Sequence, residues 1–273
     1  MTDTEKAALA VKEQKLYDIV RGFLPGGIYL AFSGGTDSAV LLKVCLNLQK
    51  ETGGKVQPVY GYSCLQCETD EEVKAIAARI GAPLEIMPLS REVMEDVLKN
   101  PVERCYLCKT HIFTGMKELA EAAGCKTVMD GTNEEDLHKH RPGLKAIAEL
   151  GVESPFADAG FSKSEVRALG EKLGVAEYNK EADSCIATRV SYKTYIDQDM
   201  IDLLKRGEKY LKGRGYTYVR IRMIQFMARI EVKKDEIQRF MDDSDRLVAD
   251  LRALGFKYLT LDMSGYEESP LEV

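Results

Sequence analysis

The strongest constraint on the fold of this chain is a polar loop between two apolar segments. The short apolar run 27–32 leads into Ser-Gly-Gly-Thr-Asp-Ser at 33–38, and the apolar segment 39–44 follows. This order predicts a buried strand, a tight loop and a helix. The two glycines remove side-chain bulk, so backbone N–H groups can close around phosphate oxygens at the positive end of the helix. We therefore predict a phosphate-binding loop.

The side chains of this loop add ligands for a nucleotide and a metal ion. Ser33 and Ser38 supply hydroxyl donors, and the carboxylate of Asp37 can lie near a phosphate when Mg²⁺ is between them. The alternative is a turn followed by a helix cap. That alternative would not require an apolar strand on one side and an apolar helix on the other. The loop lacks the lysine of a Walker-type loop, which argues against transfer of a γ-phosphoryl group.

Strands and helices alternate after the loop. We expect strands at 55–62, 83–89 and 127–131, and helices at 70–80 and 111–123. Such alternation predicts an α/β fold with a parallel sheet, which binds ligands beyond the carboxyl ends of its strands. The expected nucleotide-binding residues are Ser33, Gly34, Gly35, Thr36, Asp37, Ser38, Asp130 and Gly131.

The pattern changes after Cys185. Helices are expected at 201–212 and 234–254, and strands at 217–223, 227–232 and 258–263. Because these elements no longer alternate simply, we predict a large domain at 1–186 and a smaller α+β domain at 187–273.

Composition limits the class of protein and its partners. Hydrophobic residues make up 45% of the 273 residues and charged residues 30%, which is typical of globular proteins. The formal net charge of −6 argues against a broad nucleic-acid surface and favours a small-molecule substrate. The N-terminus lacks the order of a signal peptide, and no apolar run is long enough to span a membrane, so we expect a cytoplasmic protein.

In the cytoplasm, cysteines are more often metal ligands or catalytic thiols than disulfides. Cys105 and Cys108 have the spacing of a metal-binding pair, and Cys185 is expected at the same end of the sheet. Three thiolates could hold a [4Fe–4S] cluster with one iron open to a sulfide. A redox disulfide or structural zinc at the pair, with Cys185 an ordinary buried thiol, fits the spacing equally well.

A second pair, Cys64 and Cys67, follows the second expected strand. It could complete a metal site, relay sulfur as a persulfide, or occupy a turn. Cys45 and Cys125 lie in apolar or helix-end contexts and are interpreted as structural.

The loop resembles the pyrophosphate (PP) loop of the ATP pyrophosphatase superfamily, whose domains are adenine nucleotide alpha hydrolase-like. The whole chain resembles the LarE family, the ATP-dependent sulfurtransferases of nickel-pincer nucleotide biosynthesis. The motifs that carry this resemblance are the loop, Cys-Tyr-Leu-Cys-Lys at 105–109, Asp-Gly-Thr-Asn at 130–133, Arg-Pro-Gly at 141–143, Cys185 and Tyr-Val-Arg-Ile-Arg at 218–222.

The resemblance implies a reaction and a homo-oligomer. ATP adenylates a carboxylate of pyridinium-3,5-biscarboxylic acid mononucleotide, and sulfur then converts that carboxylate to a thiocarboxylate with release of AMP. Some family members sacrifice the sulfur of the cysteine equivalent to Cys185, leaving dehydroalanine. Others, which also have the equivalents of Cys105 and Cys108, are thought to carry a three-cysteine cluster, and this sequence matches them.

The resemblance also implies roles for charged residues. Arg220 and Arg222 alternate on a strand and should face one side, where they would bind a substrate phosphate. Arg141 is also expected to bind the substrate. Without the resemblance, a solvated arginine pair on an outer sheet face is the favoured interpretation. Lys109 joins Asp37 and Cys185 as an expected catalytic residue, although a lysine at a helix start is usually solvated.

Two other functions compete with this hypothesis. A tRNA-thiolating enzyme has the same loop, but the acidic balance of the chain opposes a surface for RNA. A non-catalytic nucleotide-binding protein with structural zinc would bind ATP without releasing pyrophosphate.

Overall fold

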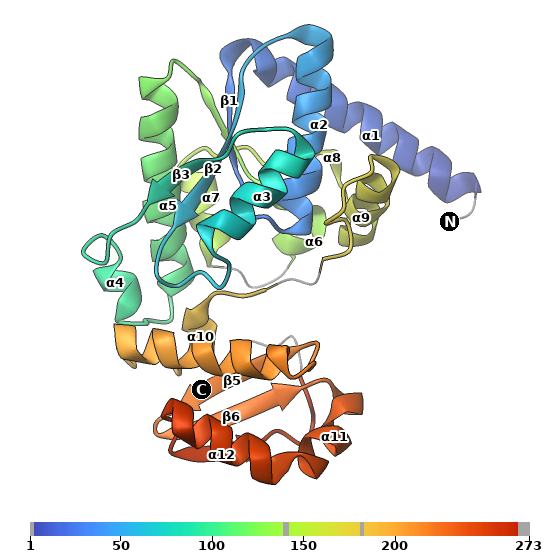
Figure 1. The fold of residues 1–273 in the computed structure, drawn as a ribbon. Helices are drawn as coiled ribbons and strands as arrows, with labels where there is room; N and C mark the ends of the chain where they lie inside the picture. The colour runs from blue at the N-terminus through green and yellow to red at the C-terminus, as the bar shows by residue number, and fades with distance from the viewer. Residues whose placement is uncertain (1–2, 139–141, 181–182, 267–273) are drawn as a thin grey trace. The chain divides into compact units, whose positions relative to one another are not determined.

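The computed structural model describes residues 3–138, 142–180 and 183–266, which form two units. The first unit is built from residues up to 63, 68–94 and 105–183. The second unit is built from residues from 184 onward together with two short segments, 64–67 and 95–104. Figure 1 shows the elements of both units in chain colours.

The first unit contains a sheet of four parallel strands in the order β3-β2-β1-β4. The strands are β1 (Ile28–Ala31), β2 (Val56–Tyr62), β3 (Glu85–Pro88) and β4 (Thr127–Met129). The chain leaves β1 for β2 and β3 on one side and returns to β4 on the other. The carboxyl ends of β1 and β4 therefore flank a topological switch point, the place where such sheets bind ligands. The predicted α/β fold with a parallel sheet is confirmed.

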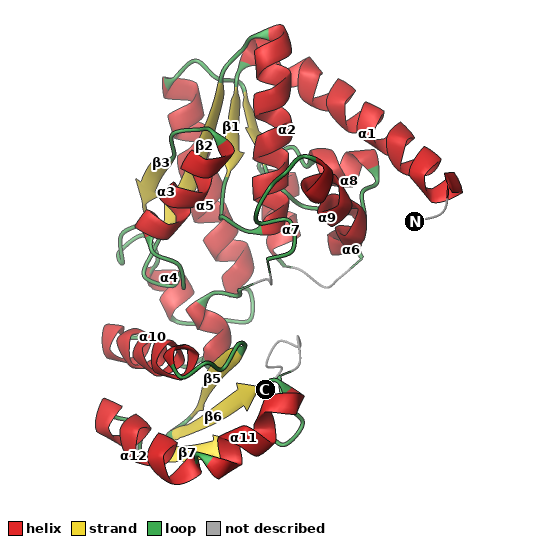
Figure 2. Ribbon diagram, turned by 45° about the vertical axis from the view of Figure 1, so that its right-hand side comes forward, coloured by secondary structure: helices red, strands yellow, loops and turns green. Residues whose placement is uncertain are grey.

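Helices cover both faces of this sheet (Figure 2). Successive residues of a strand face opposite sides. Leu30 accordingly packs in a buried cluster with α1, α2, α3, α8 and α9, whereas Tyr29 packs in another with α5 and α7. The helices are α1 (Asp3–Phe23), η1 (Leu24–Gly26), α2 (Thr36–Thr52), α3 (Asp70–Ile80), α5 (Arg104–Ala122), α6 (Glu134–Leu137), α7 (Gly143–Glu149), α8 (Pro155–Ala159) and α9 (Lys163–Lys172).

Helix α5 begins earlier than the expected helix at 111–123. The backbone N–H of Arg104 donates to the carbonyl of Pro101 at 3.1 Å, and no proline follows in the helix. Proline is compatible with the start of a helix but not with its interior, so the helix runs from just after Pro101. Cys105 and Cys108 therefore lie in the first turns of α5.

The second unit contains a mixed sheet in the order β5-β6-β7. Strands β5 and β6 pair antiparallel, and β7 pairs parallel to β6. Val219 and Ile221 of β5 are fully buried, and α10 packs on this strand. The elements are α4 (Glu95–Leu98), η2 (Ile186–Arg189), α10 (Gln198–Gly213), β5 (Val219–Ile224), β6 (Met227–Val232), η3 (Lys234–Glu236), α11 (Ile237–Asp242), α12 (Ser244–Leu254) and β7 (Tyr258–Leu261).

Segment 234–254 is helical, as expected, but it is not one continuous helix. Three segments, η3, α11 and α12, occupy it, and the break between α11 and α12 falls at Asp243. Asp-Asp-Ser at 242–244 explains this break, because short polar side chains compete for backbone hydrogen bonds and favour helix ends.

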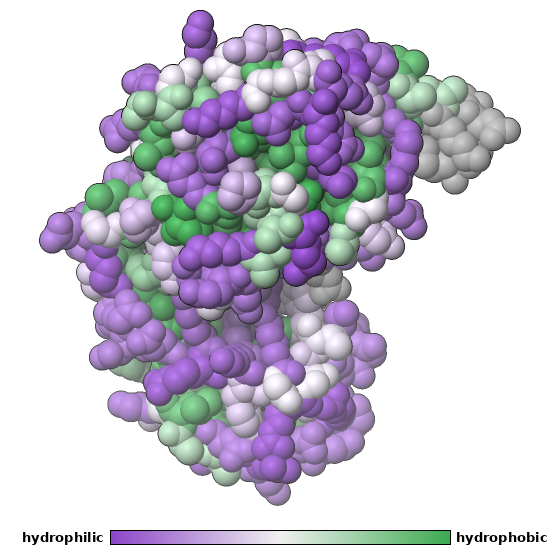
Figure 3. Space-filling view, turned by 45° about the horizontal axis from the view of Figure 1, so that its top comes forward, coloured by the Kyte–Doolittle hydropathy of each residue, from purple (hydrophilic) through white to green (hydrophobic). Residues whose placement is uncertain are grey.

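The visible surface of both units in Figure 3 is mostly hydrophilic, with smaller hydrophobic areas between. None of the helices in the described ranges is both long and apolar enough to cross a membrane.

Helix α9 is held at its N-terminus by a capping box. The Oγ of Ser162 accepts from the backbone of Glu165, and the Glu165 carboxylate accepts from the backbone of Ser162 at 2.8 Å. Lys12 of α1 donates to the same carboxylate at 2.7 Å. Burial raises the pKa of the Glu165 carboxyl, but these hydrogen bonds outweigh burial and hold its pKa below the ordinary value.

This capping box predicts a pH-dependent contribution to stability. A carboxyl group whose folded-state pKa is lowered contributes stability above its ordinary pKa, and that contribution is lost as the pH falls from about 4.5 through the lowered value. Glu165→Gln should therefore reduce the free energy of unfolding by ~1 kcal/mol near pH 7 and by much less in acid. Urea unfolding at both pH values measures the difference, and exposed Glu171→Gln on the same helix is the control. If Glu165→Gln lowered the free energy of unfolding equally at both pH values, the stabilisation would not depend on the ionised Glu165 carboxylate.

Candidate active site

The loop at 33–38 is closed by hydrogen bonds between its own ends. The backbone N–H of Ser33 donates to Oγ of Ser38 at 3.3 Å, and that hydroxyl donates to the carbonyl of Gly35 at 3.1 Å. Gly34 has φ 72°, and a Cβ there would lie 3.1 Å from Cδ1 of Ile76. Glycine adopts this left-handed backbone without strain, which explains the first glycine of the motif.

Helix α2 starts directly from this loop without a side-chain cap. Its N-cap residue is Gly35, which forms no side-chain capping hydrogen bond. The first N–H groups of the helix are thus available to an anion, and the helix dipole favours a phosphate there. The Thr36 hydroxyl donates to the carbonyls of Glu177 at 2.8 Å and Lys180 at 3.2 Å. The Thr36 side chain therefore anchors the loop, and its backbone amide is the group left for a nucleotide.

Asp37, in the first turn of α2, has two differently placed carboxylate oxygens. Oδ2 accepts a hydrogen bond from Nζ of Lys163, the first residue of α9. Oδ1 is buried and has no hydrogen-bond partner in the described parts of the chain. A buried carboxylate oxygen without a partner is costly, and carboxylate oxygens are the ligands that Mg²⁺ prefers. The geometry of Asp37 therefore fits a Mg²⁺ ligand.

The turn after β4 lies directly against this loop. A Cβ on Gly131 would be 3.0 Å from the backbone nitrogen of Ser38 and 3.1 Å from Cβ of Asp37. Only a residue without a side chain allows the two backbones to approach so closely. The predicted nucleotide-binding residues of β1 and β4 are therefore together at the switch point.

Asp130 shapes the same turn. Its carboxylate accepts from Thr132 Oγ1 at 2.6 Å, from the Thr132 backbone at 3.1 Å and from Ser154 Oγ at 2.7 Å. Nζ of Lys109 lies 3.9 Å from the carboxylate and 4.9 Å from the centre of the Phe113 ring. Asp130 thus holds both the turn and a half-exposed lysine from α5.

Contacts continue from Lys109 to the start of α7. A Cβ on Gly143 would be 3.1 Å from Cγ of Lys109 and 3.5 Å from the carbonyl oxygen of Cys105. The glycine of the Arg-Pro-Gly motif therefore packs against the first turns of α5, beside the first cysteine pair. Arg141, the expected substrate-binding residue of that motif, lies outside the described residues.

The predicted cluster ligands are divided between the two units. Cys105 is exposed and Cys108 partly buried, and their spacing within α5 places them on one helix face. Cys185, also partly buried, belongs to the second unit. Among the described residues, no group of three His, Cys, Asp or Glu side chains is gathered as metal ligands. The three-cysteine cluster stays a prediction.

Cys185 is held by its own backbone carbonyl. That oxygen accepts from the N–H of Thr188 at 3.1 Å, from its hydroxyl at 2.8 Å and from Nη1 of Arg189 at 3.0 Å. Arg189 is fully buried and forms a two-point ion pair with Glu208 of α10, at 3.0 and 3.2 Å. Glu208 also accepts from the backbone of Ile221 in β5. The position of Cys185 thus depends on a buried ion pair that also orders the sheet.

The arginines of β5 are buried rather than solvated. Nε of Arg222 donates to Glu231 of β6 at 2.7 Å, and its Nη1 donates to the carbonyl of Thr188 at 3.0 Å. Arg220 lies over the ring of Tyr218, 4.6 Å from its centre. The interpretation as an exposed arginine pair is wrong, because both residues are at most 5% exposed. Arg222 instead joins the sheet to the loop of Cys185.

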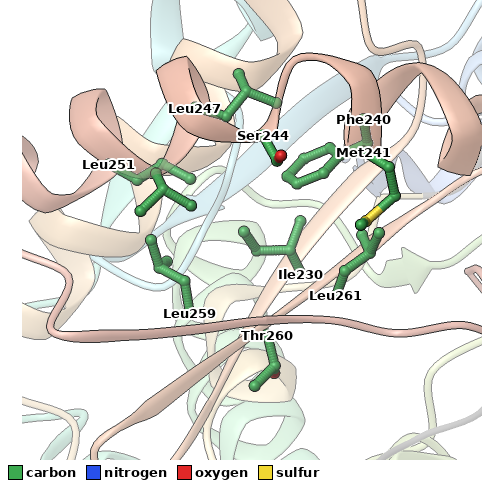
Figure 4. A pocket seen from close by; sticks show the side chains of 10 residues that line it. Ile230, Phe240, Met241, Ser244, Leu247, Leu251, Leu259, Thr260 and Leu261 are labelled. Carbon is green, nitrogen blue, oxygen red and sulfur yellow. The ribbon is translucent and has the colours of Figure 1, made fainter.

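A pocket within the second unit lies under α11 and α12 (Figure 4). Its volume is about 140 Å³, and its walls include Phe240, Leu247 and Leu261. Ligand-binding pockets usually measure roughly 300–1,000 Å³ and contain convergent polar groups. Ser244 and Thr260 are the polar residues in this lining. We therefore interpret the pocket as a gap in apolar packing rather than a catalytic site.

An uncapped Ser-Gly-Gly loop at the switch point of an all-parallel sheet defines an α/β nucleotide-binding domain of the PP-loop class. No protein-family model matches the chain. The chain is 33% identical over 263 residues to pyridinium-3,5-bisthiocarboxylic acid mononucleotide synthase of Lactiplantibacillus plantarum, covering 95% of this chain and 93% of that protein. This chain therefore belongs to the LarE family.

Two uncharacterized proteins are also similar to the chain. One, from Synechocystis, is 35% identical over 244 residues, which cover 89% of this chain and 90% of that protein. The other, from Methanocaldococcus jannaschii, is 28% identical over 241 residues, covering 88% of this chain and 90% of that protein.

Sequence reasoning did not find two lysines at the loop. Lys163 pairs with Asp37, and Nζ of Lys180 donates to the carbonyl of Gly34 at 3.3 Å. The capping pattern Ser-x-x-Glu at 162–165 places Lys163 at the start of a helix and was a usable signal. Lys180 follows an irregular segment, and no local pattern connects it to the loop.

Gly131 gives a direct test of the site. In Gly131→Ala, the added methyl group must displace the backbone of α2 at Ser38, so we expect ATP to bind about tenfold more weakly, because overpacking typically costs 1–3 kcal/mol. Isothermal titration calorimetry measures the affinity. Gly22→Ala is the control, since a Cβ there meets no atom within 4 Å. If Gly131→Ala bound ATP with unchanged affinity, the turn at Gly131 would not be part of the nucleotide-binding site.

Proposed function

We propose that this protein is an ATP-dependent sulfurtransferase that converts a carboxylate of pyridinium-3,5-biscarboxylic acid mononucleotide to a thiocarboxylate, releasing AMP and pyrophosphate. The observation that carries this proposal is the similarity over 95% of the chain to a named pyridinium-3,5-bisthiocarboxylic acid mononucleotide synthase. The uncapped loop at the switch point supports it from the structure, because such a loop suits the phosphates of ATP.

In the proposed first step, the loop and Asp37 act on the phosphates of ATP. The N–H groups that start α2 would bind phosphate oxygens, and Asp37 would hold a Mg²⁺ ion that neutralises charge on the phosphates. Lys163, now paired with Oδ2, adds a positive charge near the leaving pyrophosphate. These groups stabilise the negative charge that develops when the bond between the α and β phosphates breaks.

Lys109 is proposed to orient the reacting carboxylate. Its ammonium group is half exposed, and its partner Asp130 is held by three other hydrogen bonds. A lysine whose stem is fixed by Gly143 and whose head remains accessible can bind an anionic group in a defined place.

Arg220 and Arg222 are proposed to bind the phosphate of the mononucleotide. Both are buried on the second sheet, and a guanidinium group recognises phosphate through paired N–H donors. Arg222 also contacts the carbonyl of Thr188, so phosphate binding there would be transmitted to the loop that carries Cys185.

The proposed sulfur carrier is a [4Fe–4S] cluster with Cys105, Cys108 and Cys185 as ligands. Thiolates are the usual ligands of such clusters, and the accessible pair on one face of α5 fits this role. When bound, the cluster would supply an iron site for the sulfide that enters the thiocarboxylate.

Asp37→Ala tests the adenylation step. Without the carboxylate, Mg²⁺ loses a protein ligand at the leaving group, so we expect pyrophosphate release to fall by about 10² or more while the fold is retained. A coupled pyrophosphate assay with ATP and the mononucleotide measures this loss. The control is Asp70→Ala, which removes a carboxylate from the first turn of α3 instead. Formation of ADP and orthophosphate by the parent protein would refute adenylation altogether.

Intact-protein mass spectrometry tests the sulfur route. If the three cysteines hold a cluster, we expect the chain mass to be unchanged after turnover of anaerobically reconstituted protein. Each single Cys→Ser change should then abolish both iron–sulfur absorbance and activity, because a hydroxyl is a poor substitute for a thiolate.

The alternative route gives the opposite pattern. If Cys185 is sacrificed, the chain mass falls by one H₂S in proportion to product. Cys105→Ser and Cys108→Ser would then retain a single turnover that Cys185→Ser loses. Recovery of the dehydroalanine form would overturn the cluster proposal.

A further inference from the structure

The second cysteine pair packs on the loop of Cys185. Segment 64–67 lies in the first half of the sequence but belongs to the second unit. The backbone N–H of Ile186 donates to the carbonyl of Leu65 at 2.8 Å. Sγ of Cys67 donates to the carbonyl of Ser184 at 3.2 Å. These two hydrogen bonds lie on either side of Cys185, so the turn at 64–67 is fixed alongside it.

The thiols of Cys64 and Cys67 are accessible rather than packed in a hydrophobic core. Leu65 is 2% exposed and anchors the turn, whereas Cys64 and Cys67 are both partly exposed. Cys45 shows the contrast, since burial raises the pKa of its thiol to about 12 and leaves almost no nucleophilic thiolate at neutral pH. Two accessible thiols separated by two residues have the spacing that thiol–disulfide chemistry uses.

We propose that Cys67 is a persulfide-carrying site and that Cys64 discharges it as sulfide beside Cys185. This inference rests on the proposed function, because it names how sulfur is supplied to that reaction. The donor belongs to the chemical class of persulfides, either a small molecule or a protein.

The first step moves a sulfur atom without net redox change. The Cys67 thiolate, formed by loss of its proton to solvent, attacks the outer sulfur of the donor R–S–SH. The donor S–S bond breaks, R–S⁻ leaves, and Cys67 becomes Cys67–S–SH. The neighbouring carbonyl of Ser184 fixes the position of this sulfur.

The second step releases sulfide. The Cys64 thiolate attacks Sγ of Cys67, a Cys64–Cys67 disulfide forms, and HS⁻ leaves with the electron pair of the broken S–S bond. The two cysteine sulfurs are oxidised and the transferred sulfur is reduced. A dithiol reductant then restores both thiols. Because Cys67 contacts the residue before Cys185, HS⁻ is released beside one of the three cysteines that the proposed function assigns to the sulfur carrier.

The experiment uses the full chain purified anaerobically and glutathione persulfide with an isotope-labelled outer sulfur. In the parent protein without reductant, we expect labelled sulfide in solution and a Cys64–Cys67 disulfide in the peptide mass spectrum. In Cys64→Ser, we expect labelled persulfide to accumulate on Cys67 with sulfide release lost. In Cys67→Ser, both signals should be lost.

The matched control is Cys125→Ala, which removes a buried thiol of the first unit and should behave as the parent protein. The gain of persulfide in Cys64→Ser keeps the test independent of whether Cys67→Ser folds. Label on Cys105, Cys108 or Cys185 in Cys64→Ser, or sulfide release by folded Cys67→Ser at the parent rate, would overturn the proposal.

Pyrophosphate release is assayed on the same samples. If the parent protein released no pyrophosphate but Cys67 was labelled normally, the proposed function would be refuted and the persulfide site would be supported. Normal pyrophosphate release without label on Cys67 would refute the persulfide site alone.

Discussion

The close approach of two backbones at Gly131 is the constraint on which the first unit depends. Parallel strands β1 and β4 end side by side, so the start of α2 and the turn after β4 must share one small space. A glycine is required there, and the carboxylate of Asp130 is then consumed in holding the turn. The result is an edge at which the turn after β4 lies against the uncapped start of α2, an arrangement that suits an anion.

The arrangement of the second unit depends instead on buried ion pairs. The pair between Arg189 and Glu208 is buried, and a buried ion pair stabilises the fold only when its remaining donors and acceptors are satisfied. Here they are satisfied by the carbonyl of Cys185 and the N–H of Ile221. Arg222 with Glu231 adds a second buried pair on the neighbouring strand. The loop of Cys185 is therefore held by electrostatic interactions, whereas the loop at 33–38 is held by hydrogen bonds and by the close approach of Gly131.

The features that could be predicted from the sequence are those that a local residue pattern determines. The strands of the parallel sheet, the loop at 33–38 and the shared strand face of Arg220 and Arg222 all follow from short-range periodicity, whereas the burial of these arginines does not. Contacts between residues that are far apart in the sequence could not be predicted in this way. Nothing near Lys180 indicates that it meets Gly34, and nothing near Cys67 indicates that it meets Ser184. Sequence reasoning also joined α11 to α12, because helical periodicity persists across the break at Asp243.

The second unit is not a contiguous module. Besides the turn at 64–67, it takes in segment 95–104, where buried Asn100 donates from its side chain to the carbonyls of Val190 and Ser191 and accepts from Lys193 through its backbone. A C-terminal fragment cut at residue 184 would leave all of these groups without their partners, each costing about 1–3 kcal/mol if it stayed buried. The second unit therefore cannot be removed or transferred as the C-terminal segment alone, although the change of pattern after Cys185 suggests such a boundary. A chimaera that keeps this unit intact would need all three sequence segments that form it.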